Sequence, residues 1–184
     1  MLLFFKYLFY LKNRVIYFII IINILYYIFS VIYNRLIKSN NSKLIYLEKQ
    51  KKYDKKYLEI AEKIAELSHA KRKKVGSIIV KNSIIISDGY NGTPTNFENE
   101  CEDDFGNTKW YTLHSEANAI IKMARSGGIS SEGATLYITL SPCKECSKLI
   151  LQAGIKRVVY LEEYKDKTGI TFLRKANVNV CQYL

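Results

Sequence analysis

The chain has 184 residues, with 28 Lys and Arg against 17 Asp and Glu, a net charge of +11 and only four Cys. So few Cys argue against a disulfide scaffold. The charge is uneven, because residues 1–51 carry +7 and leave +4 for the remaining 133 residues. Such a mild excess argues against a nucleic-acid groove, which usually shows a basic stripe.

The N-terminal segment 1–46 differs in composition from the rest of the chain. Residues 1–43 contain no Asp, Glu, Gly, Ala or Pro, and 15–33 form an apolar stretch interrupted mainly by Asn23 and Ser30. A helix of this length spans about 28 Å, close to the hydrocarbon thickness of a bilayer. We expect a hydrophobic helix here. It is either a transmembrane helix at 15–33 or the translation of an A/T-rich stretch ahead of the true start.

Residues 52–184 predict one folded domain in which helices and strands alternate. An amphipathic helix is expected at 57–67, with Asp54 as its N-cap. Two nearly continuous apolar strands follow, at 75–80 and 84–88, as in a sheet covered on both faces. Further helices are predicted at 114–124, 142–153 and 168–175, and further strands at 134–140, 157–160 and 177–181. This order predicts a three-layer α/β/α sandwich around a mixed five-stranded sheet.

The segment 93–112, between the second strand and the second helix, is acidic. It contains Glu98, Glu100, Glu102, Asp103 and Asp104, with Cys101 among them. A run of charged residues is typical of a solvated loop, and we expect one here.

The most informative pattern is His114-Ser-Glu116, followed by Pro142-Cys143-Lys-Glu-Cys146, with 27 residues between His114 and Pro142. One imidazole and two thiolates fill three of the four tetrahedral positions on Zn²⁺ and leave the fourth for water. Glu116 is close enough to move a proton of that water without binding the metal. Pro142 suits the first position of a helix whose first turn holds both Cys, where the helix dipole favours thiolates.

Two other interpretations of the Cys pair stay open. A C-x-x-C pair after a strand is also typical of a redox dithiol or of half a structural zinc site. A redox pair leaves His114 and Glu116 unexplained. A structural site needs a fourth ligand, for which the candidates are Cys101, Cys181 and His69. We therefore favour a catalytic zinc site.

The pattern H-x-E…P-C-x-x-C is that of zinc-dependent nucleobase deaminases. Four segments, at 89–94, 114–120, 141–146 and 153–160, resemble the deoxycytidylate (dCMP) deaminases of the cytidine and deoxycytidylate deaminase family. The resemblance covers about residues 52–184. It implies a cytidine-deaminase-like fold and an enzyme that hydrolyses dCMP to dUMP and ammonia, which supplies the precursor of thymidylate.

The resemblance also implies roles for individual residues. His114, Cys143 and Cys146 would hold Zn²⁺, and Glu116 would be the catalytic acid and base. Substrate contacts would come from Asn91, Arg72, Tyr164 and Lys165. The alternatives are a turn residue for Asn91 and solvated surface side chains for the other three. Ser115 departs from the family, which usually has Ala there.

The binding partners expected for this chain also come from the resemblance. The resemblance implies a homo-oligomer, either hexamer or dimer, and regulation by dCTP and dTTP with Mg²⁺, for which the segment 93–112 is a candidate. We expect a cytoplasmic catalytic domain, no nucleic-acid partner, and a membrane only if 15–33 is a genuine span. The alternatives in function are a tRNA-adenosine or other nucleobase or nucleoside deaminase, and a non-catalytic, membrane-tethered zinc-binding module.

Overall fold

A computed structural model describes the backbone of residues 2–125, 127 and 129–184. Side chains are described for the same residues except 2–25, 28, 36, 39 and 40. The chain divides into two units, Met1–Gln50 and Lys51–Leu184. One helix, α1, is assigned over Leu2–Glu66, and the division between the units falls within it.

The first unit is helical. Where its side chains are described they are mostly exposed, and Phe29 stacks on Tyr33 with 6.3 Å between ring centroids. Among the residues with described side chains, no helix has a long enough apolar stretch to cross a bilayer. The span expected at 15–33 lies mostly outside those residues, because the side chains of 15–25 and 28 are not described. It stays a prediction.

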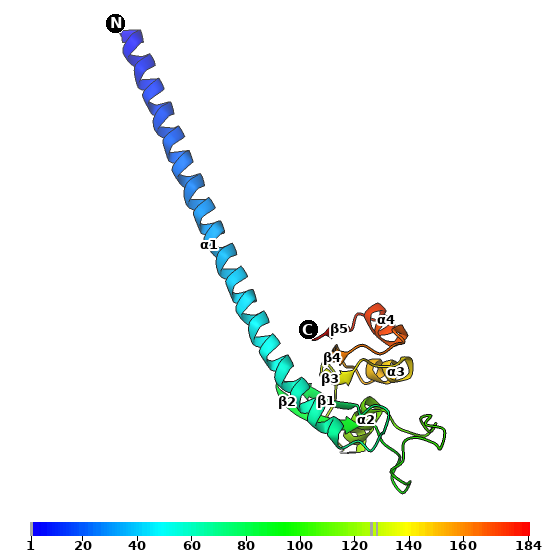
Figure 1. The fold of residues 1–184 in the computed structure, drawn as a ribbon. Helices are drawn as coiled ribbons and strands as arrows, with labels where there is room; N and C mark the ends of the chain where they lie inside the picture. Colours follow the sequence, from blue (N-terminus) through cyan, green and yellow to red (C-terminus); the bar gives the residue numbers. More distant parts are fainter. Residues whose placement is uncertain (1, 126, 128) are drawn as a thin grey trace. The chain divides into compact units, whose positions relative to one another are not determined.

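The second unit is built on a mixed five-stranded sheet with the strand order β2-β1-β3-β4-β5 (Figure 1). β1 is antiparallel to both of its neighbours, whereas β3, β4 and β5 are parallel. Asn82 and Ser83, with φ of 50° and 64°, form the two-residue turn between β1 and β2, as is typical of hairpins. The strands are β1 (Gly76–Lys81), β2 (Ile84–Tyr90), β3 (Thr135–Leu140), β4 (Arg157–Glu162) and β5 (Asn179–Gln182).

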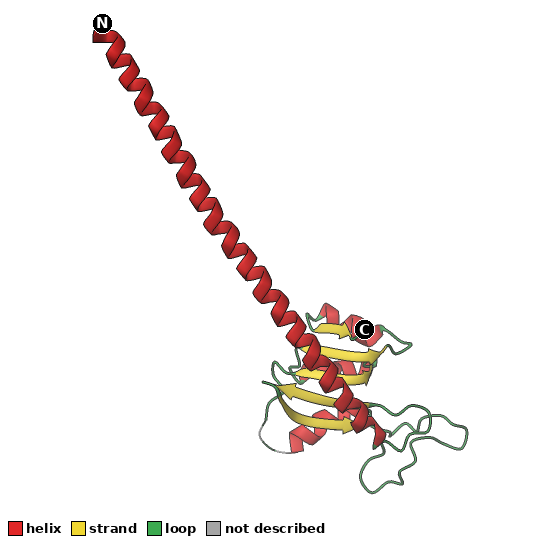
Figure 2. Cartoon of the chain, turned by 60° about the vertical axis from the view of Figure 1, so that its left-hand side comes forward, coloured by secondary structure: helices red, strands yellow, loops and turns green. Residues whose placement is uncertain are grey.

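Helices cover both faces of this sheet (Figure 2). Successive strand residues point to opposite faces. Ile78 therefore packs with Leu58 of α1, while Ile79 belongs to the cluster that contains Ala119 of the next helix. The second face is covered by α2 (Ser115–Arg125), α3 (Lys144–Gln152) and α4 (Thr168–Lys175). The predicted three-layer sandwich with a mixed five-stranded sheet is confirmed.

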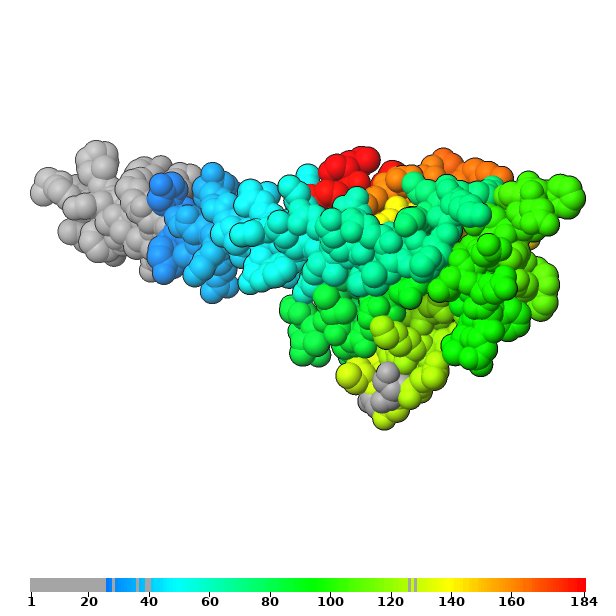
Figure 3. Space-filling model, turned by 60° about the horizontal axis from the view of Figure 1, so that its bottom comes forward, coloured from blue at the N-terminus to red at the C-terminus, as the bar shows by residue number. Residues whose placement is uncertain are grey.

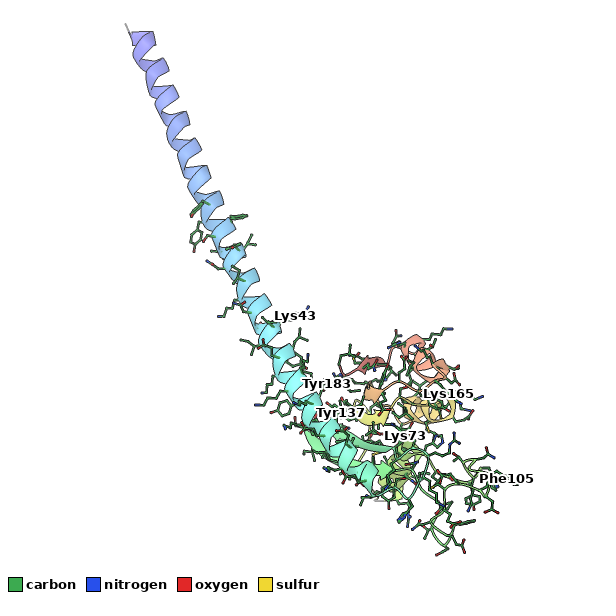
Figure 4. The ribbon with its side chains drawn as sticks, in the orientation of Figure 1. Lys43, Lys73, Phe105, Tyr137, Lys165 and Tyr183 are labelled. Atoms are coloured by element: carbon green, nitrogen blue, oxygen red, sulfur yellow. The ribbon has the colours of Figure 1, made fainter. Side chains whose placement is uncertain are left out.

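The expected role of Asp54 as an N-cap was wrong. Asp54 lies inside α1 and is buried, 6% exposed. Nη1 and Nη2 of Arg157 in β4 donate to its carboxylate, at 2.7 and 2.6 Å, and the hydroxyl of Tyr137 in β3 donates at 2.8 Å. Figure 2 shows the C-terminal end of α1 crossing the strands on this face, Figure 3 shows residues 51–66 at the surface of this side of the unit, and Figure 4 labels Tyr137. Asp54 thus ties α1 to two central strands.

Candidate active site

The three expected zinc ligands come from the N-terminal ends of two helices. His114 directly precedes α2, and Cys146 lies in the first turn of α3. We expected Pro142 at the first helical position, but α3 begins at Lys144 and Cys143 is its N-cap. The reason is that the Cys143 sulfur accepts the backbone N–H of Cys146 at 3.5 Å and so does the work of a capping side chain. The sulfur of Cys143 therefore caps α3 and is at the same time placed to bind a metal.

The geometry of this cluster suits zinc. Nδ1 of His114 lies 3.4 Å from the sulfur of Cys143 and 3.4 Å from the sulfur of Cys146. The three ligand atoms all lie within 4.8 Å of one another. A tetrahedral zinc with bonds of about 2.3 Å to sulfur and about 2.05 Å to nitrogen requires N···S distances of about 3.5 Å. All four cysteines of the chain are free, so no disulfide competes for these sulfurs.

The two sulfurs differ in their tendency to lose a proton. Hydrogen bonds from Cys146 and from His114 lower the pKa of Cys143 to about 3. The pKa of Cys146 is raised by its hydrogen bond to Cys143 and by burial, and the pKa of His114 is raised by its hydrogen bond to Cys143. These hydrogen bonds favour the thiolate form of Cys143. A divalent cation bound there would displace the remaining protons, as metal binding to such ligands does.

Glu116 lies in the first turn of α2, beside the ligands but buried at 3% exposure. The hydroxyl of Ser115 donates to its Oε2 at 3.1 Å. Burial raises the pKa of Glu116, because the charged carboxylate loses its hydration. A carboxyl group that takes up a proton more readily than usual is what general acid–base catalysis requires near neutral pH.

A pocket of about 270 Å³ opens over the cluster. His114, Glu116 and Cys143 form part of its wall. Three of the four expected substrate contacts, Asn91, Arg72 and Tyr164, also line it. The fourth, Lys165, lines a separate depression together with residues of α4. Figure 4 labels Lys165 and also Lys73, a pocket-lining residue.

The amide of Asn91 holds the chain that leads into β1. Its Oδ1 accepts the N–H of Val75 at 2.8 Å, and its Nδ2 donates to the carbonyl of Lys73 at 2.9 Å. An amide nitrogen carries a second hydrogen, which can serve a ligand. Asn91 therefore has a structural role, and its contact with substrate stays a prediction.

Sequence reasoning missed several residues of the pocket wall, among them Thr108, Ser141 and Glu102. The expectation of a solvated loop at 93–112 holds for its other acidic residues but was wrong for Glu102, which is 8% exposed. Glu102 accepts hydrogen bonds from the backbone of Lys71 and Arg72, about 30 positions earlier. No local pattern reveals a partner of that kind.

Comparisons with known proteins agree with this geometry. A family model described as the cytidine and deoxycytidylate deaminase zinc-binding region matches residues 51–162. The deoxycytidylate deaminase of Enterobacteria phage T4 is 37% identical over 166 residues, covering 67% of this chain and 86% of that protein. The deoxycytidylate deaminase of Saccharomyces cerevisiae is 33% identical over 141 residues, covering 71% of this chain and 45% of that protein.

A solved structure gives the same result. The dCMP deaminase of cyanophage S-TIM5, crystallised with dCMP and dUMP, has a TM-score of 0.69 and 44% sequence identity. The match covers 71% of this chain and 96% of that one. Together with the His114, Cys143 and Cys146 cluster, these matches confirm the predicted zinc-binding enzyme. The chain belongs to the cytidine and deoxycytidylate deaminase family.

Proposed function

We propose that this protein is a deaminase that converts dCMP to dUMP and ammonia with one catalytic Zn²⁺. The observation that carries the proposal is a single pocket that joins the zinc cluster and the buried Glu116 to the cationic side chain of Arg72. The relatives named deoxycytidylate deaminase, and the cyanophage enzyme crystallised with dCMP and dUMP, support this choice of substrate.

The size and charge of the pocket support a mononucleotide. Its volume of about 270 Å³ suits one small molecule. Arg72 and Lys73 on its wall supply the cationic donors that a 5′-phosphate needs. Asn91 would contact the nucleotide, and Tyr164, which lines the same pocket, would contact its phosphate. Lys165 lines another depression, and its phosphate contact stays a prediction.

The residues divide the chemistry between them. His114, Cys143 and Cys146 would hold Zn²⁺, which when bound supplies a Lewis acid that lowers the pKa of water towards neutrality. Glu116 accepts a proton from the attacking water and delivers it to N3 of the cytosine ring. As the C4–O bond forms and the C4–N bond breaks, Glu116 passes a second proton to the departing amine. Ammonia leaves, and a uracil ring remains.

The direct test is ammonia release from dCMP, CMP, deoxycytidine and dCTP, measured side by side with and without a zinc chelator. We expect the highest kcat/KM with dCMP and loss of activity with chelator. Equal rates with all four compounds would contradict the proposed substrate. Activity that survives complete removal of zinc would contradict the proposed chemistry.

The family resemblance gives the further partners that we propose. These are a homo-oligomer, a hexamer or a dimer, and regulation by dCTP and dTTP with Mg²⁺. The alternative of a tRNA-adenosine deaminase has weaker support. The solved tRNA deaminase shares 22% identity at a TM-score of 0.51, which extends to the fold alone.

A further inference from the structure

Glu102 lines the active-site pocket yet has no part in the chemistry proposed above. Its side chain is buried, and a buried carboxylate must be stabilised by hydrogen-bond donors. The donors are backbone amides. The N–H of Lys71 contacts both carboxylate oxygens at 3.1 Å, and the N–H of Arg72 contacts Oε1 at 3.1 Å. Glu102 thus fixes two successive peptide groups beside the pocket.

We propose that Glu102 is a positioning residue for the substrate's phosphate, because it fixes the backbone that presents Arg72 and Lys73 to the pocket. The proposal rests on the proposed function, in which these two side chains bind the phosphate. The same part of the loop also holds the Arg72 side chain. Nη1 of Arg72 donates to Oγ1 of Thr108 at 3.4 Å, and Thr108 is bridged to Glu102 through the backbone.

The segment that Glu102 holds has little regular structure of its own. Residues 71–74 lie between α1 and β1, and their side chains are exposed. Asn91 holds the other end of this segment through Lys73 and Val75. Without such anchors the segment would have to be ordered when substrate binds, and that ordering would weaken binding.

The charge of Glu102 makes the proposal easy to distinguish from a simple electrostatic effect. A carboxylate in the same pocket repels a phosphate. If Glu102 acted through its charge alone, its neutralisation would strengthen the binding of dCMP. If Glu102 positions Arg72, neutralisation weakens that binding, because a glutamine places an N–H donor opposite one of the amides. The two interpretations therefore predict opposite changes in the affinity for dCMP.

The experiment compares the zinc-loaded full-length protein with its Glu102→Gln and Glu98→Gln variants. Glu98→Gln removes the same charge from an exposed position on the same loop. Turnover is measured with dCMP and deoxycytidine, and calorimetry measures the binding of dUMP and deoxyuridine. Each pair of compounds differs only in the phosphate. For Glu102→Gln we expect the dCMP-to-deoxycytidine ratio of kcat/KM to fall at least about tenfold, mainly through KM for dCMP. Glu98→Gln keeps the wild-type ratio.

Two further variants complete the test. Glu102→Asp keeps the charge but shortens the side chain, so we expect an intermediate loss; this variant decides the question if Glu102→Gln does not fold. Combined with Arg72→Gln, the Glu102→Gln change should add little, because both act through one contact. An unchanged or higher phosphate preference in Glu102→Gln overturns the proposal, as does an equal loss with both members of each pair. If the wild-type protein releases no ammonia from dCMP, the proposed function fails, and the dUMP-to-deoxyuridine binding ratio still decides the role of Glu102.

Discussion

At the scale of residues, Glu116 and the three ligands beside it have different roles. The ligand atoms of His114, Cys143 and Cys146 converge on one point, whereas the carboxyl group of Glu116 is buried and accepts the hydroxyl of Ser115. This arrangement lets the site hold a metal without Glu116. Metal content and turnover can therefore be separated by mutation.

Glu116→Gln should keep zinc and lose turnover. Glutamine preserves the shape of the side chain but cannot carry the proton, so we expect kcat to fall by about 10² to 10⁴. Metal analysis of the purified variant should still give the wild-type zinc content. A variant with nearly normal kcat would show that another group moves the proton.

Cys143→Ser should lose the zinc, whereas Glu116→Gln keeps it. Cys143 is both a ligand and the N-cap of α3; serine can replace the cap but binds zinc poorly. We expect zinc affinity to fall by more than about 100-fold, beyond the range typical of groups outside the ligand shell. Competition with a chelator measures the affinity. Cys181→Ser, which removes a thiol outside the cluster, is the matched control and should bind zinc normally.

At the scale of elements, the pair Asp54–Arg157 connects α1 to the sheet. The two side chains are 8% and 21% exposed, so removal of one partner leaves the other charge largely desolvated. We expect Asp54→Asn to lower the free energy of unfolding by about 3 kcal/mol, measured by urea denaturation. Lys56→Gln breaks the exposed pair Lys56–Glu59 of the same helix and should leave the free energy of unfolding almost unchanged, because water screens exposed charges. Equal effects of both changes would contradict a buried role for Asp54.

The elements also show which features the sequence can reveal. Nearly continuous apolar runs such as 75–80 predicted a sheet covered on both faces, because both faces need apolar side chains. The metal cluster was predicted although His114 lies 29 and 32 positions from the two Cys, because these residue types in this order form a described zinc motif. Asp54 and Glu102 escaped prediction for a common physical reason. Their partners are 103 and about 30 positions away, and an Asp before an amphipathic stretch looks the same whether it caps a helix or pairs with a distant Arg.

At the scale of the whole molecule, the two units predict where the chain can be shortened. All the site residues and the core they rest on belong to Lys51–Leu184. A protein of residues 51–184 should therefore fold, bind one zinc and keep kcat/KM for dCMP within about twofold of the full chain, since removal of residues outside the core has little effect on stability. Loss of activity in this protein would show that residues 1–50 contribute to the site.

A protein of residues 68–184 should fail in a different way. It lacks the part of α1 that supplies Leu58 and Asp54, so one face of the sheet, with Ile78 and Val80, is exposed to water. Burial of one large apolar side chain contributes about 1.5–3 kcal/mol, and the net stability of a domain is only about 5–15 kcal/mol. The loss of several such contacts exceeds that margin. We expect no cooperative unfolding transition and no zinc binding, measured by circular dichroism and metal analysis, and a cooperative transition would contradict the role of α1 as the third layer of the sandwich.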